Sequence, residues 1–169
     1  MHHGSLDRVS TLVSTIWGVI GFKVRTAFCK AERHEKGGTV DHPNVARARQ
    51  ALAAFAAGDI ESYKQFFADD VAWHVSGHHP LSGTYRGKEE LFEYFARIRE
   101  LTGGSLRVET DRILADAGHV GIFARVTAQR DGRNLDVKMA QALHVSPEGN
   151  WTEYWALSDD QEAVDAFWS

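Results

Sequence analysis

The second half of the chain alternates between apolar and polar residues in four stretches, and three short turn segments separate these stretches. The turn segments read ADAGH, QRDGRN and SPEGN, and each carries a Gly beside polar residues that favour a hairpin. An alternation with a period of two residues is typical of a strand with one buried face. Residues 104–157 therefore predict an antiparallel meander of four strands. The apolar phase shifts between Val108 and Ile113, which predicts a β-bulge in the first of them.

Helical patterns precede this meander. Apolar residues recur at helical spacing from Pro43 until Gly58, and Asp59 is a suitable N-cap for a second, short helix. Residues 68–75 alternate like a strand, 76–87 read as a Gly- and Ser-containing loop, and 88–101 form the clearest amphipathic helix. This order predicts an α+β fold in which helices cover one face of a strongly curved sheet.

The first 41 residues differ from the rest and are expected to form an N-terminal extension, flexible or weakly structured, before one domain at 42–169. Residues 12–22 are an uncharged apolar run of eleven, too short to span a bilayer as a helix. Three interpretations stay open for the extension: a flexible tail, a membrane-associating or docking helix, and an export signal. We favour the tail, a cytoplasmic protein and no membrane contact through this run.

Composition narrows the function classes. The net charge of -4 gives no electrostatic reason to expect a nucleic-acid partner. The single cysteine, Cys29, excludes an intrachain disulfide. No Gly-rich phosphate loop or Cys-x-x-Cys pair occurs, so no cofactor is expected.

The most informative polar residue is Glu153 in the stretch NWTEYWAL. Strict alternation would place Trp151, Glu153 and Trp155 on one face, and Gln141 interrupts the apolar face of the neighbouring strand in the same way. A buried carboxylate has a raised pKa and suits acid–base chemistry. Glu153 and Gln141 therefore predict the polar groups of a cavity between sheet and helices. The same face could instead pair two subunits, with Glu153 bound to an arginine, or the register could be misassigned.

His74 is a second candidate for proton transfer, because its ordinary pKa lies near neutrality. A hydrogen-bonded structural histidine is the alternative. His74, His78 and His79 do not form a recognised zinc pattern and no cysteine joins them, so no metal site is expected. Residues expected in the core would also line the cavity: Trp73, Val75, Tyr85, Phe95, Met139 and Trp155.

Residues 42–169 resemble the SnoaL-like branch of the nuclear transport factor 2-like superfamily, which includes ketosteroid isomerases and polyketide cyclases. Three segments carry the resemblance: AFAAGDIESYKQFFADDVAWHVSG, PLSGTYRGKEELFEYFARI and LHVSPEGNWTEYWALSDD. The resemblance implies a cone, in which a curved, mostly antiparallel sheet wraps round a long helix with two further N-terminal helices. It also implies an apolar pocket and a homodimer through the sheet.

The resemblance leaves the reaction open. The position of the isomerases' general-base aspartate corresponds to Val75, and the Arg-x-Asp motif of related epoxide hydrolases is missing. We therefore expect a small apolar molecule as partner and, if the protein is an enzyme, an isomerase or cyclase that needs no cofactor. Glu153 would act as base or acid, His74 as an alternative base and Gln141 as a hydrogen-bond donor. A binding or dimerisation module without catalysis is the alternative, and an epoxide hydrolase is disfavoured.

Overall fold

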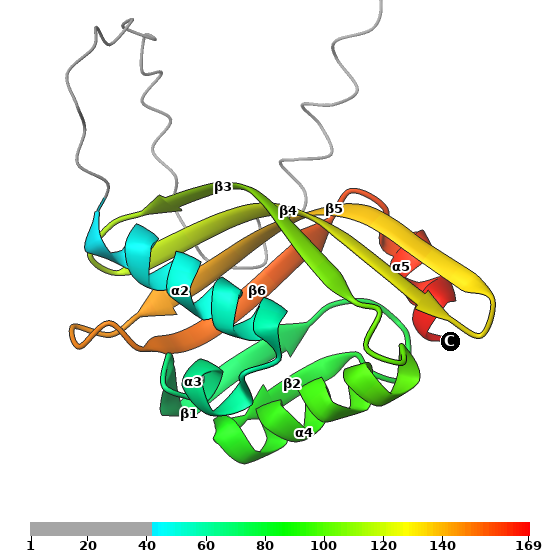
Figure 1. Ribbon diagram of the computed structural model, residues 1–169, viewed down its shortest axis with the longest axis horizontal. Helices are drawn as coiled ribbons and strands as arrows, with labels where there is room; N and C mark the ends of the chain where they lie inside the picture. Colours follow the sequence, from blue (N-terminus) through cyan, green and yellow to red (C-terminus); the bar gives the residue numbers. More distant parts are fainter. Residues whose placement is uncertain (1–41) are drawn as a thin grey trace, which may run out of the picture. The chain divides into compact units, whose positions relative to one another are not determined.

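The computed structural model describes residues 42–169, which fold into four helices and one six-stranded sheet (Figure 1). The predictions made for residues 1–41, including the apolar run at 12–22, lie outside the described residues. The elements follow in this order: α2 (Pro43–Ala57), α3 (Ile60–Lys64), β1 (Phe67–Val75), β2 (Gly83–Arg86), α4 (Gly87–Leu101), β3 (Arg107–Ala115), β4 (His119–Arg130), β5 (Arg133–Val145), β6 (Trp151–Ser158) and α5 (Gln161–Trp168).

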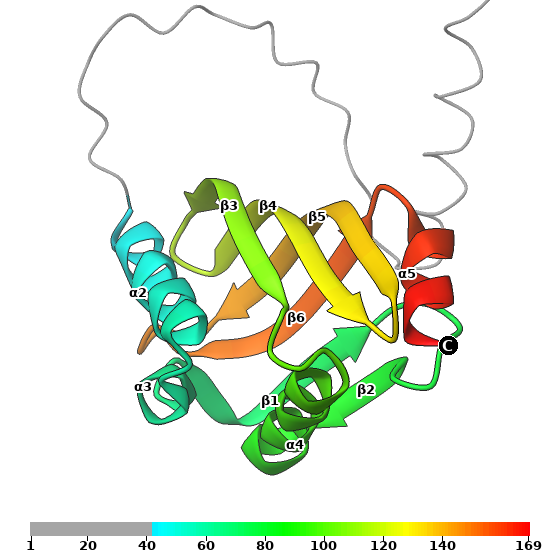
Figure 2. The same ribbon diagram turned by 45° about the vertical axis from the view of Figure 1, so that its right-hand side comes forward.

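The sheet has the strand order β2-β1-β6-β5-β4-β3. The three predicted hairpins join β3 to β4, β4 to β5 and β5 to β6, and all three pairs are antiparallel. β1 pairs with the last strand, β6, in parallel. The sheet is strongly curved, with α2 and α5 at its two sides in Figure 2. The predicted α+β class is therefore confirmed, and so is the predicted bulge, which lies between Thr110 and Arg112.

Both of the first two helices begin where their local sequence signals predict, and α2 also ends there. Pro43 occupies the first turn of α2, and Gly58 ends this helix in the left-handed conformation with φ 71°. A side-chain oxygen of Asp59 accepts a hydrogen bond from the backbone N–H of Ser62 at 3.1 Å and caps α3.

Two elements were not predicted from the sequence. The segment expected to be a loop at 76–87 contains β2, a strand of four residues that pairs with the end of β1. The chain then ends in α5, whose buried residues Val164, Phe167 and Trp168 pack on the sheet beside Ile98 of α4. Both elements are short and owe their stability to the surfaces on which they pack.

The main core is a cluster of aromatic rings between α3, α4 and the sheet. Phe67 is only 1% exposed, and its ring centroid lies 4.9 Å from that of Tyr63 and 5.3 Å from that of Trp151. Trp73 of β1 stacks on Tyr154 of β6, with ring centroids 3.5 Å apart and planes 3° from parallel. This stack covers the junction of the two parallel strands.

Within residues 42–169, no helix has both the length and the apolar character needed to cross a membrane.

Replacing Phe67 by Ala should lower the free energy of unfolding by about 3–5 kcal/mol, because the ring leaves a cavity among neighbours that cannot collapse. Urea unfolding followed by fluorescence measures this loss. Leu114→Ala is the control, since Leu114 is 55% exposed and its removal should change stability by less than about 1 kcal/mol. Equal losses for the two variants would contradict the assignment of Phe67 to the centre of the core.

Candidate functional site

A β-bulge in β6 decides which of its side chains face the helices. In β5, the adjacent residues His144 and Val145 pair with Glu153 and Trp151 of β6. Thr152 lies between these two partners and is therefore an extra residue in β6. One extra residue shifts the alternation of side chains by one position. Trp151 and Tyr154 are therefore both buried on the inner face, at 2% and 8% exposure.

The predicted orientation of Glu153 is wrong for this reason. Its side chain lies on the outer face of the sheet and is 33% exposed. Nε2 of His74 donates a hydrogen bond to Glu153 Oε1 at 2.9 Å, and Nδ1 of His144 lies 3.4 Å from Oε2. The carboxylate thus lies between two imidazoles, rather than inside a cavity.

Trp155 lies on the outer face beside this carboxylate, because its ring stacks on His74 with centroids 5.2 Å apart. Nδ1 of His74 forms a hydrogen bond with the hydroxyl of Thr84 at 2.9 Å, so both ring nitrogens have partners. His74 is one of the residues that border the inner cavity, but its imidazole ring lies on the outer face of the sheet. The catalytic roles suggested for Glu153 and His74 stay predictions, and their position argues against action on a ligand among the helices.

A cavity of about 140 Å³ lies between the inner face of the sheet and the helices. Five of the residues expected to line a pocket are in its wall: Trp73, Val75, Phe95, Met139 and Gln141. Trp155 and Tyr85 are not. The hydroxyl of Tyr85 donates to the backbone oxygen of Leu81 at 2.8 Å, and its ring packs against Tyr94. Gln141 and Glu153, expected to be close together, lie on opposite faces.

The cavity wall contains polar groups but no Asp, Glu, Lys or Arg. Three phenols contribute to it, Tyr63 from α3, Tyr94 from α4 and Tyr154 from β6. Burial raises the pKa of all three well above the ordinary value, so they are protonated at neutral pH. Within residues 42–169, none of these three hydroxyls has a hydrogen-bond partner. They are therefore neutral donors available to the cavity.

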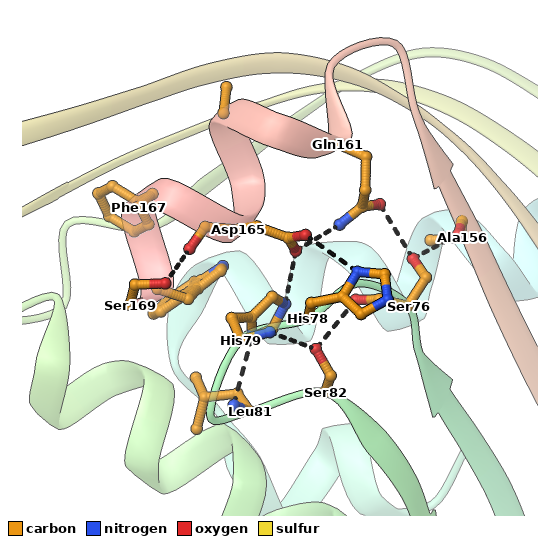
Figure 3. A network of polar contacts seen from close by, with 12 residues as sticks. Ser76, His78, His79, Leu81, Ser82, Ala156, Gln161, Asp165, Phe167 and Ser169 are labelled. Carbon is orange, nitrogen blue, oxygen red and sulfur yellow. Dashed lines mark hydrogen bonds and ion pairs between the residues drawn. The ribbon is translucent and has the colours of Figure 1, made fainter.

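A polar network at the α5 end of the cavity was missed in the sequence (Figure 3). The loop that follows β1 brings Ser76 and His79 against Gln161 and Asp165 of α5. Ser76 Oγ donates to Gln161 Oε1 at 3.2 Å, and Gln161 Nε2 donates to Asp165 Oδ1 at 3.0 Å. His79 Nε2 lies 4.0 Å from the same carboxylate oxygen, and the His79 side chain is only 1% exposed. Ser76, His79 and Gln161 also line the cavity.

The close packing of this loop on α5 requires a glycine. Gly77 has φ 105°, and a Cβ atom at this position would lie 2.1 Å from Asp165 Oδ1. Arginines fix the far end of the helix, because Arg130 and Arg133 donate to the carbonyl oxygens of Trp168 and Ala166 at 2.8 and 2.9 Å. The helix that walls this end of the cavity is thus held from two sides.

The histidines considered for zinc are not brought together as one site. The ring of His74 lies on the outer face of the sheet, the His78 side chain is 97% exposed, and the His79 side chain is buried. Among residues 42–169, no group of three or more His, Cys, Asp or Glu side chains is arranged to hold a metal ion.

Burial lowers the pKa of His79 below its ordinary value of about 6.5, and the Asp165 carboxylate and the Ser76 carbonyl only partly oppose this. The folded protein therefore takes up a proton at His79 less readily than the unfolded chain. The stability supplied by the neutral ring should be complete above about pH 6.5 and should be lost as the pH falls below that value. His79→Gln should show a weaker fall in unfolding free energy between about pH 7 and pH 5 than the unchanged protein.

Urea unfolding at several pH values measures this difference. His78→Gln is the matched control and should keep the pH dependence of the unchanged protein, because His78 is exposed to solvent. An identical pH dependence in His79→Gln would contradict a neutral, buried His79.

Comparison with known proteins agrees with this architecture. A family model described as a SnoaL-like domain matches residues 48–154. The uncharacterized protein Rv0034 of Mycobacterium tuberculosis (strain ATCC 25618 / H37Rv) is 30% identical over 130 residues, which cover 76% of this chain and 98% of that protein.

Solved structures give the same result. Bal32a, from a soil-derived mobile gene cassette, superimposes with a TM-score of 0.71 and 30% identity, over 75% of this chain and 96% of that chain. TerC, co-crystallized with polyporic acid, has the same fold with a TM-score of 0.66 and 20% identity, over 75% of this chain and 98% of that chain. The chain belongs to the SnoaL-like domain family.

Proposed function

We propose that this protein binds a small, uncharged and mostly apolar molecule in the cavity between its sheet and helices. The observation that carries the proposal is the composition of the cavity wall, which is predominantly apolar and holds no Asp, Glu, Lys or Arg. An ion transferred into such surroundings would lose its hydration without gaining an opposite charge, so a neutral ligand is favoured.

The size of the cavity limits the ligand further. Its volume of about 140 Å³ is similar to that of an engineered cavity of about 150 Å³ that holds benzene in another protein. The ligand part enclosed here is therefore about as large as one six-membered ring. TerC, which has the same fold, was co-crystallized with polyporic acid, and this supports a small molecule as the ligand proposed here.

The proposal is one of binding, and it assigns no reaction. Proton transfer on a ketone or polyketide-like ligand, the activity of an isomerase or cyclase, needs a proton acceptor beside the ligand. Glu153 and the His74 ring lie on the outer face, and Gln141 is an amide that donates hydrogen bonds but does not take up a proton at neutral pH. The epoxide-hydrolase alternative stays disfavoured by the missing Arg-x-Asp motif.

Filling the cavity should abolish binding. Ala156 of β6 lines the cavity, and Ala156→Phe should weaken the binding of benzene at least tenfold, a loss of about 1.4 kcal/mol. Ligand-detected NMR measures the affinity. Ala96→Phe is the control of equal size, because Ala96 is exposed on α4. Glu153→Gln should likewise leave the affinity unchanged within about twofold. A loss in Glu153→Gln with none in Ala156→Phe would place the ligand on the outer face and contradict the proposal.

We propose in addition that two copies of the chain pair through the outer face of the sheet. Phe123 and Leu157, 44% and 66% exposed, flank the small Ala140 in one row across β4, β5 and β6. The next row places Ala142 beside Trp155. In a two-fold pairing, the large side chains of one copy can lie over the small ones of the other, so the patch is suited to itself. Trp151, which the alternative interpretation of this face placed in such an interface, belongs to the core.

Leu157→Arg should weaken this pairing at least tenfold, because it buries an unpaired charge twice in a symmetric interface. Light scattering coupled to size-exclusion chromatography gives the mass of each variant. Ala96→Arg adds the same charge to the exposed side of α4 and should remain dimeric. A monomeric unchanged protein at about 100 μM would refute the pairing.

A further inference from the structure

Three side chains on the outer face of the sheet form a chain of hydrogen bonds that joins a hydroxyl, an imidazole and a carboxylate. Thr84 Oγ1 lies 2.9 Å from Nδ1 of His74, and Nε2 of the same ring lies 2.9 Å from Glu153 Oε1. The three residues come from the neighbouring strands β2, β1 and β6. A nucleophile beside a base that a third group orients is the general arrangement of nucleophilic catalysis.

The carboxylate determines the direction of both hydrogen bonds. An ionised carboxylate only accepts, so the proton of the neutral His74 ring is on Nε2 and the lone pair is on Nδ1. The Thr84 hydroxyl therefore donates to Nδ1, which is the nitrogen that can withdraw its proton. The second oxygen of Glu153 lies 3.4 Å from Nδ1 of His144, and the ring of Trp155 stacks on His74. The carboxylate and the imidazole are thus both held in place.

The register of β1 and β2 places a backbone donor beside the hydroxyl. The N–H of Arg86 donates to Glu90 Oε2 at 2.7 Å, so it points away from β1. Because residues two positions apart in a strand point the same way, the N–H of Thr84 also points away from β1. It reaches the edge of β2 that pairs with no other strand of residues 42–169. A backbone N–H beside a nucleophile can hold the oxygen of a tetrahedral intermediate.

The hydroxyl opens on a groove with room for a small ester. The groove has a volume of about 460 Å³ and is lined by His74 and Thr84 together with Trp155 and Leu157 of β6. Among the described residues, no Asp, Glu, Lys or Arg lines it, so an uncharged substrate is favoured. Trp155 and Leu157 also belong to the patch proposed to pair two copies, whereas Thr84 is exposed and lies two strands away on β2.

We propose that Thr84, His74 and Glu153 form a second site, which hydrolyses small uncharged carboxylic esters. Thr84 Oγ1 attacks the carbonyl carbon while its proton passes to His74 Nδ1. The bond between this carbon and the alcohol oxygen then breaks, and His74 gives the proton to the leaving oxygen. Glu153 accepts from Nε2–H throughout and stabilises the charge that forms on the ring, so it is a positioning residue.

Water completes the cycle. A water molecule attacks the acyl ester on Thr84 and loses a proton to His74 Nδ1. The bond to Thr84 Oγ1 breaks, and His74 returns the proton to this oxygen. The net reaction converts one ester and one water into a carboxylic acid and an alcohol. The site does not depend on the proposed cavity ligand, because Thr84 does not line the cavity.

Hydrolysis of p-nitrophenyl acetate tests the proposal. Thr84→Val replaces the hydroxyl by a methyl group and should lower kcat/KM about a hundredfold, whereas Thr84→Ser should keep most of the activity. Glu153→Gln should lower kcat about tenfold without a change in KM, because Glu153 acts only through the ring. His78→Gln is the control for reaction at exposed imidazoles and should leave the rate unchanged, since its side chain is 97% exposed.

Equal activity in Thr84→Val and the unchanged protein would overturn the proposal, and so would equal losses in Thr84→Val and Thr84→Ser. Because Thr84 is exposed, neither variant should disturb the fold.

Diisopropyl fluorophosphate gives a second readout, because an activated hydroxyl displaces its fluoride and keeps the phosphoryl group. Mass spectrometry of peptides should find this group on Thr84 of the unchanged protein and at least tenfold less of it on Thr84 in His74→Gln. His78→Gln should be labelled like the unchanged protein. An unlabelled Thr84 in the unchanged protein, or equal labelling in His74→Gln, would refute activation of the hydroxyl by His74.

Discussion

The extra residue at Thr152 determines the chemistry of both faces of the sheet. Because the side chains of a strand alternate, one inserted residue transfers every later side chain of β6 to the other face. Without it, Glu153 would enter the core and Tyr154 would lie outside. With it, Tyr154 stacks on Trp73 in the cavity wall, and Glu153 meets His74 outside.

This arrangement separates two kinds of polar group. The outer face collects the ionisable side chains His74, His144 and Glu153, which are partly exposed to water. The inner face collects neutral donors, phenols and one imidazole, in a wall without charged side chains. A carboxylate on the inner face would need a partner or a proton, whereas a protonated phenol needs neither. The inner face is thus suited to hydrogen bonding with a neutral ligand.

The parts of the fold that local sequence signals determine were predictable. Pro43, Gly58 and Asp59 mark helix boundaries through their own backbone and side-chain chemistry, and the Gly-containing turns fix the hairpins. The bulge in β3 was also predictable, because its apolar phase shifts visibly. The bulge at Thr152 is harder to read, since Tyr154 and Trp155 are adjacent and the large side chains of this strand follow neither register throughout. The predicted orientation of Glu153 was wrong because strict alternation was assumed from Trp151 onward.

The site at α5 depended on packing over a long sequence distance. The spacing of Val164, Phe167 and Trp168 behind the N-cap Asp160 is a usable helix signal, although eight residues are too few to establish a helix without its packing surface. In the sequence, five of the six strands lie between His79 and Asp165. No local sequence signal near His79 predicts that Asp165 is its neighbour. Gly77 is the one local indication of this contact, because a glycine between Ser76 and His78 lets the backbone of the loop approach α5 closely.

The polar groups of the cavity argue that the protein keeps this space for binding. Phenylalanine in place of Tyr63, Tyr94 or Tyr154 would preserve the ring packing and remove a hydroxyl that has no partner within the described residues. Leucine in place of His79 would remove another unpaired donor. Of these donors only the His79 Nε2–H is a fully buried atom without a partner, and such an atom costs about 1–3 kcal/mol relative to one that is hydrogen-bonded. The three phenols line the cavity, and their hydroxyls can donate to acceptor oxygens of a molecule bound there, which packing alone does not require.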